Sequence, residues 1–321
     1  MSILILSDAQ VREVLDMDSC IAAMRDVLAE LARGGLTNPL RFVMRPPVDS
    51  MMGFMPAYRG GVDPVYSLKE VVIAPANHGR GMDPHQGAVL IHDGTTGAVK
   101  AIMNASTITE IRTAAVSALA TQLLARPDSR RVAVIGSGVQ GRSHIDAMRC
   151  AIPDADIVIW SRTRAHAERL ATVTGCTVAD SISDAMRGAD VVCTTTSSKE
   201  PIINREMLEP GMHLNVVGSS IAAAREFTGD AVAASSLFVD RRESTLNESG
   251  DYLGAVRESG IGPDHIQAEL GEILISAHKG RTSPEEITMF KSLGIAVEDL
   301  AAAQLCIDRA RQRGVGSEVA W

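Results

Sequence analysis

The chain has 321 residues and a formal net charge of −8 at pH 7, and a chain of this length usually forms about two domains. The acidic balance, with no basic run and an aromatic content of 3%, argues against nucleic acid as a partner. No stretch approaches the roughly 20 consecutive apolar residues that a membrane-spanning helix needs, so we expect no membrane partner.

The first hundred or so residues predict a strand, a helical region, a sheet and a second helix, in that order. The strand covers residues 3–6, and Ser7 or Asp8 caps a helical region that runs to about Ala32. Between Arg41 and Lys100, short apolar runs alternate with Pro, Gly and Asp-Gly turns, a pattern typical of an antiparallel sheet with hairpins. The Ala-rich stretch 107–124 then predicts a helix.

From Arg130 onward, strands alternate with helices. The strands are expected at 132–135, 157–160, 191–194, 213–217 and 237–239, and helices between them begin near Val139, Arg164 and Ile182. This alternation predicts βαβ units and a doubly wound parallel sheet of the Rossmann type. The segment 283–313 is expected to be helical throughout, opened by the sequence Ser-Pro-Glu-Glu.

A glycine-rich loop follows the first strand of the second half and opens a helix. Its residues are Gly136, Ser137, Gly138, Val139, Gln140 and Gly141. In a dinucleotide-binding fold the first glycine permits a tight turn, the second lets the pyrophosphate approach the backbone, and the third lets helix and strand pack closely. The alternative is a glycine turn in a sheet that binds nothing. Since strand, loop and helix occur in the right order, we favour a dinucleotide site at Gly136 and Gly138 through Gly141.

The end of the next strand bears on which dinucleotide binds. An NAD site carries an acidic residue there for the ribose 2′-hydroxyl, but this sequence has Ser161, Arg162 and Thr163. Guanidinium and hydroxyl groups suit a 2′-phosphate, so NADP(H) is favoured and NAD(H) remains possible. The alternative is that Arg162 and Arg164 belong to an ordinary solvated helix start.

Beyond these motifs, the chain resembles the ornithine cyclodeaminase/μ-crystallin family almost from end to end. The resemblance rests on several stretches in the same order: Pro39-Leu40-Arg41, Met55-Pro56-Ala57, Leu68-Lys69, residues 93–97 (DGTTG), residues 109–115 (TEIRTAA), the glycine loop, residues 248–251 (ESGD) and residues 288–299 (TMFKSLGIAVED). It implies an NAD(P)-dependent enzyme acting on the Cα–N bond of amino or imino acids.

The resemblance also implies the domain organisation and the assembly. We expect a substrate-binding and dimerisation domain of the α/β class from residues 1–115 plus 300–321, and a Rossmann domain from residues 116–299. The sheet region 41–103 has several apolar strands and few helices to cover them, so its exposed face needs a partner. We therefore expect a homodimer formed through the first domain.

Family resemblance places Arg41, Lys69 and Arg112 around a substrate carboxylate. A planar guanidinium binds such a group through two parallel hydrogen bonds. Arg112 lies in an apolar, Ala-rich helix, where a charge needs a partner. The alternatives are a structural ion pair for Arg112 and an outward-facing strand lysine for Lys69. With the resemblance we favour substrate binding for all three and assign Lys69 to catalysis as well.

The main departure from the family pattern is Ser220. Cyclodeaminases of the family carry an aspartate at this place, where it handles the amino group of the substrate. A serine hydroxyl cannot act as an ionised base at neutral pH without help, although it still forms hydrogen bonds. We therefore assign Ser220 to catalysis in a reductase or dehydrogenase rather than in a true cyclodeaminase.

Three further residues are assigned to cofactor binding. Thr195 follows a strand at the carboxyl edge of the sheet, where cofactors lie in open α/β folds, although a polar loop there is an equal alternative. Thr113 and Gly294 lie in stretches that carry the resemblance. No metal site is expected, because the histidines at positions 78, 85 and 92 are seven residues apart, which is not a ligand spacing.

Together these observations predict an enzyme that reduces a cyclic or linear α-imino acid, such as a pyrroline- or piperideine-2-carboxylate, with hydride from NAD(P)H. The alternatives are an ornithine cyclodeaminase, an alanine-type dehydrogenase, or a non-catalytic ligand carrier. Five cysteines without paired spacing favour a reducing compartment. The N-terminus lacks the basic region of a signal peptide, so we expect a cytoplasmic enzyme.

Overall fold

The structure is a computed structural model that describes residues 2–82 and 85–321. The chain divides into two compact units, one of Met1–Arg112 with Ile295–Trp321 and one of Thr113–Gly294. The first boundary falls inside a helix, α3 (Ala105–Leu124), and the second falls just before α11 (Ala296–Arg313). The domain division expected from the sequence cuts α11 at residue 300, whereas the whole of that helix groups with the first unit.

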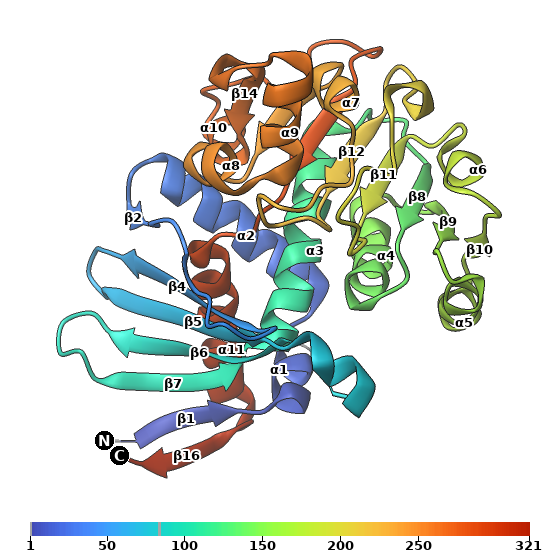
Figure 1. The fold of residues 1–321 in the computed structure, drawn as a ribbon. Helices are drawn as coiled ribbons and strands as arrows, with labels where there is room; N and C mark the ends of the chain where they lie inside the picture. The colour runs from blue at the N-terminus through green and yellow to red at the C-terminus, as the bar shows by residue number, and fades with distance from the viewer. Residues whose placement is uncertain (1, 83–84) are drawn as a thin grey trace. The chain divides into compact units, whose positions relative to one another are not determined.

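The first unit is a mixed sheet with helices packed against it (Figure 1). Its strands follow the order β16-β1-β7-β6-β5-β4-β2, and β3 pairs with β4. All neighbours are antiparallel except β1 and β7. Helix α11 contacts β4, β5 and β6, and also packs on α2. The elements are β1 (Ser2–Leu6), α1 (Asp8–Val14), α2 (Met17–Ala32), β2 (Leu36–Thr37), β3 (Phe42–Met44), β4 (Met51–Arg59), β5 (Val65–Ile73), a 3-10 helix (Pro75–Arg80), β6 (His85–Asp93), β7 (Val99–Asn104) and β16 (Ser317–Ala320).

The N-terminal helical region, which was expected to run to about Ala32, consists of two helices. Ser7 caps α1 through a reciprocal pair of hydrogen bonds with Gln10. Leu15 is extended and ends α1, and the Asp16 side chain then accepts a hydrogen bond from the Ser19 N–H, which starts α2. The hydrophobic period continues across this break, so the period alone did not show it, but Asp16 is a standard N-cap residue.

The second unit is a parallel sheet of eight strands in the order β10-β9-β8-β11-β12-β15-β13-β14. This is the doubly wound arrangement predicted from the sequence, and the Rossmann-type fold class is confirmed. Its further elements are β8 (Arg131–Ile135), α4 (Val139–Ala151), β9 (Asp156–Trp160), α5 (Arg164–Thr174), β10 (Thr177–Val178), α6 (Ile182–Met186), β11 (Val191–Thr194), a 3-10 helix (Arg205–Met207), β12 (His213–Val216), α7 (Gly229–Ala233), β13 (Ser236–Val239), α8 (Arg242–Glu248), α9 (Gly250–Ser259), a 3-10 helix (Pro263–His265), β14 (Ile266–Glu269), α10 (Leu270–Leu274) and β15 (Thr288–Lys291).

The direction of winding reverses between β8 and β11, which lie next to each other and are separated in sequence by two βα units. In open α/β sheets, ligands bind outside the carboxyl ends of the strands at such a switch point. The glycine loop follows β8 at this edge, and Thr195 follows β11. The fold therefore brings these two predicted cofactor segments together.

The expectation of a continuous helix over residues 283–313 is wrong. Strand β15 (Thr288–Lys291) occupies the first part and pairs in parallel with both β12 and β13. The Ser283 side chain accepts a hydrogen bond from the Glu286 N–H, so the Ser-Pro-Glu-Glu sequence closes a turn before a strand. Strand β15 is entirely buried, and a short buried apolar run has no alternation that would separate it from a helix.

Two fully buried histidines form hydrogen bonds within the second unit. His144 of α4 lies between the Gln140 carbonyl, 2.8 Å from Nδ1, and the Ser117 hydroxyl of α3, 2.9 Å from Nε2. His213 of β12 contacts Thr288 and Asn215 in the same way. Burial lowers the pKa of His144 to about 4 and that of His213 to about 3. Both rings are therefore neutral at pH 7.

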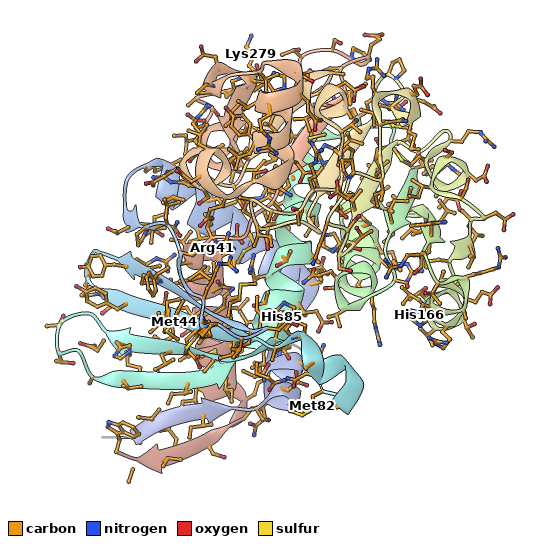
Figure 2. All side chains as sticks on the ribbon, in the orientation of Figure 1. Arg41, Met44, Met82, His85, His166 and Lys279 are labelled. Carbon is orange, nitrogen blue, oxygen red and sulfur yellow. The ribbon has the colours of Figure 1, made fainter. Side chains whose placement is uncertain are left out.

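These pKa values predict acid destabilisation. Below about pH 6.5 these histidines bind protons in the unfolded chain but stay neutral in the folded protein. The free energy of unfolding therefore falls as the pH drops towards 4. Each histidine contributes a loss of about 2 kcal/mol between pH 7 and 5. Urea unfolding at the two pH values measures it. His144→Gln should reduce this pH dependence, whereas His166→Gln, on the exposed face of α5 (Figure 2), should not.

Candidate functional site

The first unit buries the two cations Lys69 and Arg112 beside two acids of α11. Lys69 Nζ lies 2.8 Å from Asp299 Oδ2, and Arg112 Nε lies 3.0 Å from Asp299 Oδ1. Arg112 Nη1 also lies 2.7 Å from Glu298 Oε2. None of the four side chains is more than 4% exposed. The ion pair considered as the alternative for Arg112 is therefore present, and it brings Arg112 to Lys69.

The strand pattern explains why Lys69 points inward. Along β5, Val65, Ser67 and Lys69 are buried, while the alternate residue Tyr66 is exposed. Side chains two residues apart share a face of a strand, and this buried face is the one that contacts α11. Lys69 is thus not the outward-facing strand lysine of the alternative interpretation.

The protonation of Lys69 is finely balanced. Burial lowers its pKa to about 8, although the charge of Asp299 raises it, and the charges of Arg112 and Arg41 lower it further. Its ammonium also lies 3.4 Å from the Thr109 hydroxyl. Arg41, which lies between β2 and β3 and is partly exposed (Figure 2), therefore belongs electrostatically to the same group as Lys69 and Arg112. The structure thus places Lys69 and Arg112 on one carboxylate of α11, and the charge of Arg41 acts on Lys69.

The geometry of the glycine loop fits a dinucleotide pyrophosphate. Gly136 has a φ of 120°, and a Cβ there would lie 2.6 Å from Thr195 Oγ1. A Cβ on Gly141 would lie 2.2 Å from the Gly136 carbonyl oxygen, so this glycine permits close packing of α4 on β8. A Cβ on Gly138 meets no atom within 4 Å. Gly138 is also the N-cap of α4 and provides no side-chain cap, so the helix begins with N–H groups available to an anion.

The end of β9 lies beside this loop. Ser161 Oγ is 2.9 Å from Ser137 Oγ in the glycine loop. Arg162 and Thr163 are exposed, and Thr163 begins α5 without a side-chain cap. The neighbouring Arg164 is already paired with Glu168 and Asp180, whereas no residue within 2–82 or 85–321 forms an ion pair with Arg162.

A buried carboxylate ties the ends of β11 and β12 together. Glu226 accepts hydrogen bonds from the Thr194 hydroxyl (2.6 Å), the Thr196 N–H and hydroxyl (2.8 and 2.7 Å) and the Gly218 N–H (2.9 Å). Burial raises the pKa of Glu226, while the hydrogen bonds from the two threonines lower it. This residue was not identified from the sequence, because nothing local to it marks it as more than a surface acid.

A second buried ion pair supports the loop that carries Ser220. Lys291, at the end of β15, lies 2.9 Å from Asp251 and donates a hydrogen bond to the Ser219 carbonyl. Asp251 in turn accepts the N–H groups of Glu226 and Phe227 at 2.8 and 3.0 Å. Ser220 is partly buried directly after this anchored segment.

The remaining predicted cofactor residues are placed in the second unit. Thr195 donates its N–H to the Ile135 carbonyl at 2.8 Å and so joins β11 to the start of the glycine loop. Gly294 has a φ of 74°, and its N–H donates to Asp240 at 2.7 Å. Thr113 is buried at the first position of the unit. No group of three or more metal-ligating side chains occurs in the described part of the chain.

The comparisons with known proteins identify the family of the chain. A family model described as ornithine cyclodeaminase/mu-crystallin family matches residues 1–314. The chain belongs to this family. The ketimine reductase mu-crystallin of Mus musculus is 39% identical over 312 residues, which are 94% of this chain and 96% of the mouse protein.

Two solved structures of the family have nearly the same fold. Thermococcus litoralis Delta(1)-pyrroline-2-carboxylate reductase, in complex with NADH and L-proline, has a TM-score of 0.93 and 32% identity over 99% of this chain and 100% of that one. An archaeal alanine dehydrogenase dimer with bound NAD has a TM-score of 0.93 and 26% identity over 100% of both chains. Within the part of this chain that the structure describes, no helix meets the length and apolarity that crossing a membrane requires.

Proposed function

We propose that the chain is an NAD(P)H-dependent reductase of a cyclic or linear α-imino acid. The observation that carries the proposal is the buried group of Lys69 and Arg112 on a scaffold shared with imino acid reductases. A substrate of this class has one fixed carboxylate, which Arg112 and Arg41 bind through charge-assisted hydrogen bonds. The bound dinucleotide supplies the hydride.

Lys69 has the properties of the proton donor. With a pKa of about 8 it is mostly protonated at pH 7, yet it gives up its proton more readily than an ordinary lysine. As the imine carbon receives hydride, the imine nitrogen takes the proton from the Lys69 ammonium, and solvent then restores that proton. Carbon and nitrogen each gain one bond to hydrogen, and the C=N double bond becomes single.

Ser220 favours reduction over cyclodeamination. A single hydride transfer needs no ionised base beside the substrate nitrogen, whereas cyclodeamination must oxidise the substrate, close a ring with loss of ammonia and then reduce it. A hydroxyl at Ser220 suits the shorter sequence, since it can orient the nitrogen through a hydrogen bond but cannot carry charge at neutral pH.

A cofactor oxidation assay tests the function. Purified protein is supplied with NADH or NADPH and a panel of cyclic imino acids, together with keto acids plus ammonia or methylamine. We expect turnover of at least one cyclic imino acid. The parallel reaction contains L-ornithine with NAD(P)⁺ and is followed by ammonia release. Robust ammonia release would replace the proposal with a cyclodeaminase, and absence of turnover on the whole panel would favour a ligand carrier.

We propose further that NADPH is preferred over NADH, which is supported by the exposed Arg162 and Thr163 beside the glycine loop. Arg162→Ala should weaken NADPH binding by about 10- to 100-fold, because a hydrogen bond to a charged group contributes about 1.5–3 kcal/mol. NADH binding should change little. The matched control is Arg164→Ala, since Arg164 is already paired with two acids. Cofactor fluorescence gives the dissociation constants of NADPH and NADH for each variant. Equal effects of Arg162→Ala on both cofactors would contradict the proposed preference for NADPH.

We also propose that two copies associate through the face of the first sheet that lacks α11. This face carries exposed Phe42 and Tyr66. Aromatic rings also pair on it in tilted contacts, with centroids 5.9 Å apart for Phe42 and Phe54 and 4.6 Å apart for Tyr58 and Tyr66. An aromatic surface of this kind is typical of a buried interface, and the archaeal alanine dehydrogenase of the same fold is a dimer.

Light scattering coupled to gel filtration measures the assembly. The wild-type protein should be a dimer at micromolar concentration, and Tyr66→Lys should yield a folded monomer, because the interface would have to bury a lysine charge without a partner. The control is Val173→Lys on α5 of the second unit, a position that is also exposed, and this variant should remain dimeric. A monomeric wild type would refute this assembly.

A further inference from the structure

The carboxylate of Asp299 touches two cations of the candidate site at once. Its Oδ2 lies 2.8 Å from Lys69 Nζ, and its Oδ1 lies 3.0 Å from Arg112 Nε. The side chain is 1% exposed, so water does not screen either contact. Asp299 therefore holds the Lys69 ammonium and the Arg112 guanidinium close together, because each contacts one oxygen of the same carboxylate.

The charged and polar groups around Lys69 come from three segments of the first unit. Asp299 approaches from α11, Arg112 and the Thr109 hydroxyl come from α3, and Arg41 acts from the segment before β3. The charge of Asp299 favours the protonated form of Lys69, while burial and the charges of both arginines oppose it. Removing that negative charge would therefore lower the pKa of Lys69 further.

We propose that Asp299 is the positioning residue that holds the Lys69 ammonium beside Arg112 and keeps it protonated for transfer to the substrate nitrogen. The inference rests on the proposed reduction, in which Lys69 is the proton donor. In the free enzyme the carboxylate of Asp299 compensates the ammonium. After the proton has left, the same carboxylate favours its return, because an anion next to a neutral amine stabilises reprotonation.

Glu298 provides a matched control because it is adjacent, buried and ion-paired with Arg112 at 2.7 Å, whereas the carboxylate that pairs with Lys69 is that of Asp299. Asp299→Asn keeps the shape of the side chain. Its single carbonyl oxygen can accept from Lys69 or from Arg112 but no longer carries a charge to either. Glu298→Gln makes the same chemical change one residue away.

The composition permits a direct measurement on the protein without substrate. The chain has five lysines, Lys69, Lys100, Lys199, Lys279 and Lys291. Lysine labelled with ¹³C at Cε therefore gives few signals, and Lys69→Arg identifies the one from Lys69. Lys199 and Lys279 are exposed, as Figure 2 shows for Lys279, and serve as surface references. Lys291, paired with Asp251, is the buried reference.

We expect the Lys69 signal to titrate at lower pH than the surface lysines. In Asp299→Asn its midpoint should fall by about one pH unit or more, which is the usual effect of losing an adjacent opposite charge. In Glu298→Gln the midpoint should stay close to that of the wild type, and Lys291 should be unmoved in both. A folded Asp299→Asn protein with an unchanged Lys69 midpoint, or an equal shift in Glu298→Gln, would overturn the role of Asp299.

The pH profile of kcat/KM is the second readout. In the wild type it should fall as the pH rises through the Lys69 pKa, and in Asp299→Asn this descending limb should move to lower pH by the same amount as the NMR midpoint. Asp299→Glu, which keeps the charge but displaces it by one methylene, covers the case in which the asparagine variant does not fold. In Asp299→Glu the descending limb should stay within about half a pH unit of the wild type, because the negative charge is retained. Its kcat should fall, because the charge is displaced. A kcat equal to that of the wild type would overturn the proposal. A shifted NMR midpoint without turnover of any imino acid would support the role of Asp299 and overturn the proposed function.

Discussion

Arg112→Ala should lower kcat/KM for the best imino acid substrate by about 100-fold or more, since a buried charge-assisted contact to a carboxylate is worth roughly 2–5 kcal/mol. The loss should appear mainly in KM, because the guanidinium holds the carboxylate equally in the ground state and in the transition state. Steady-state kinetics at pH 7, corrected for the folded fraction, measure the effect. An efficiency within a few-fold of the wild type would show that Arg112 does not bind the substrate.

The same substitution should also destabilise the protein. Arg112 pairs with Glu298 and Asp299, so its removal leaves buried carboxylates with one cation fewer. Breaking a buried pair from one side typically costs about 3–5 kcal/mol. Adding Glu298→Gln to Arg112→Ala should restore part of the stability without restoring kcat/KM. Urea unfolding of the single and double variants separates the structural role of Arg112 from its role towards substrate.

Gly138→Ala should abolish most dinucleotide affinity without destabilising the fold. The new methyl group meets no protein atom within 4 Å, and the backbone φ of −79° is acceptable to alanine. It would instead occupy the space through which a pyrophosphate approaches the N-terminus of α4. We expect a dissociation constant raised by about tenfold or more, because displaced phosphate contacts are charge-assisted, and an unchanged melting temperature.

Substitutions of two other glycines serve as comparisons for Gly138→Ala. Gly141→Ala places its Cβ 2.2 Å from the Gly136 carbonyl oxygen, so it should lower stability by about 1–3 kcal/mol as overpacking does, and weaken the dinucleotide as a consequence. Gly262→Ala, in equally open space before a 3-10 helix, should change neither property. Calorimetry and cofactor titration on the three variants give the comparison. Normal affinity in Gly138→Ala would show that the dinucleotide does not approach the loop there.

The fold was predictable where the sequence carries a local period or a local cap. The alternation of strands and helices after Arg130 gave the parallel sheet because each element has its own apolar run and its own turn. Strand β15 was missed because its position between β12 and β13 depends on long-range pairing. The Ser-Pro-Glu-Glu turn before it has the same residues as a helix start, so local chemistry favoured the wrong element there.

The candidate site was predictable from charges placed in apolar surroundings, and less so from their partners. Lys69 and Arg112 each interrupt an apolar run, which marks them as buried charges. Glu298 lies 186 positions from Arg112 in sequence, so no spacing connects the two. A signal did exist, because Glu298 and Asp299 are adjacent acids in an otherwise apolar part of α11, the same pattern that singled out Arg112. Applying it to acids as well as to bases would have found them.

The division of the first unit between the two ends of the chain has a consequence for synthesis on the ribosome. Lys69 and Arg112 are made early, but the acids that neutralise them lie on α11, which follows the whole second unit. Until α11 emerges, burying the two cations is strongly unfavourable, since each lacks its counter-ion. The second unit is contiguous in sequence and carries its own ion pairs, so it can fold before the N-terminal segment has completed the first unit. Closure of β16 against β1 then joins the last strand made to the first.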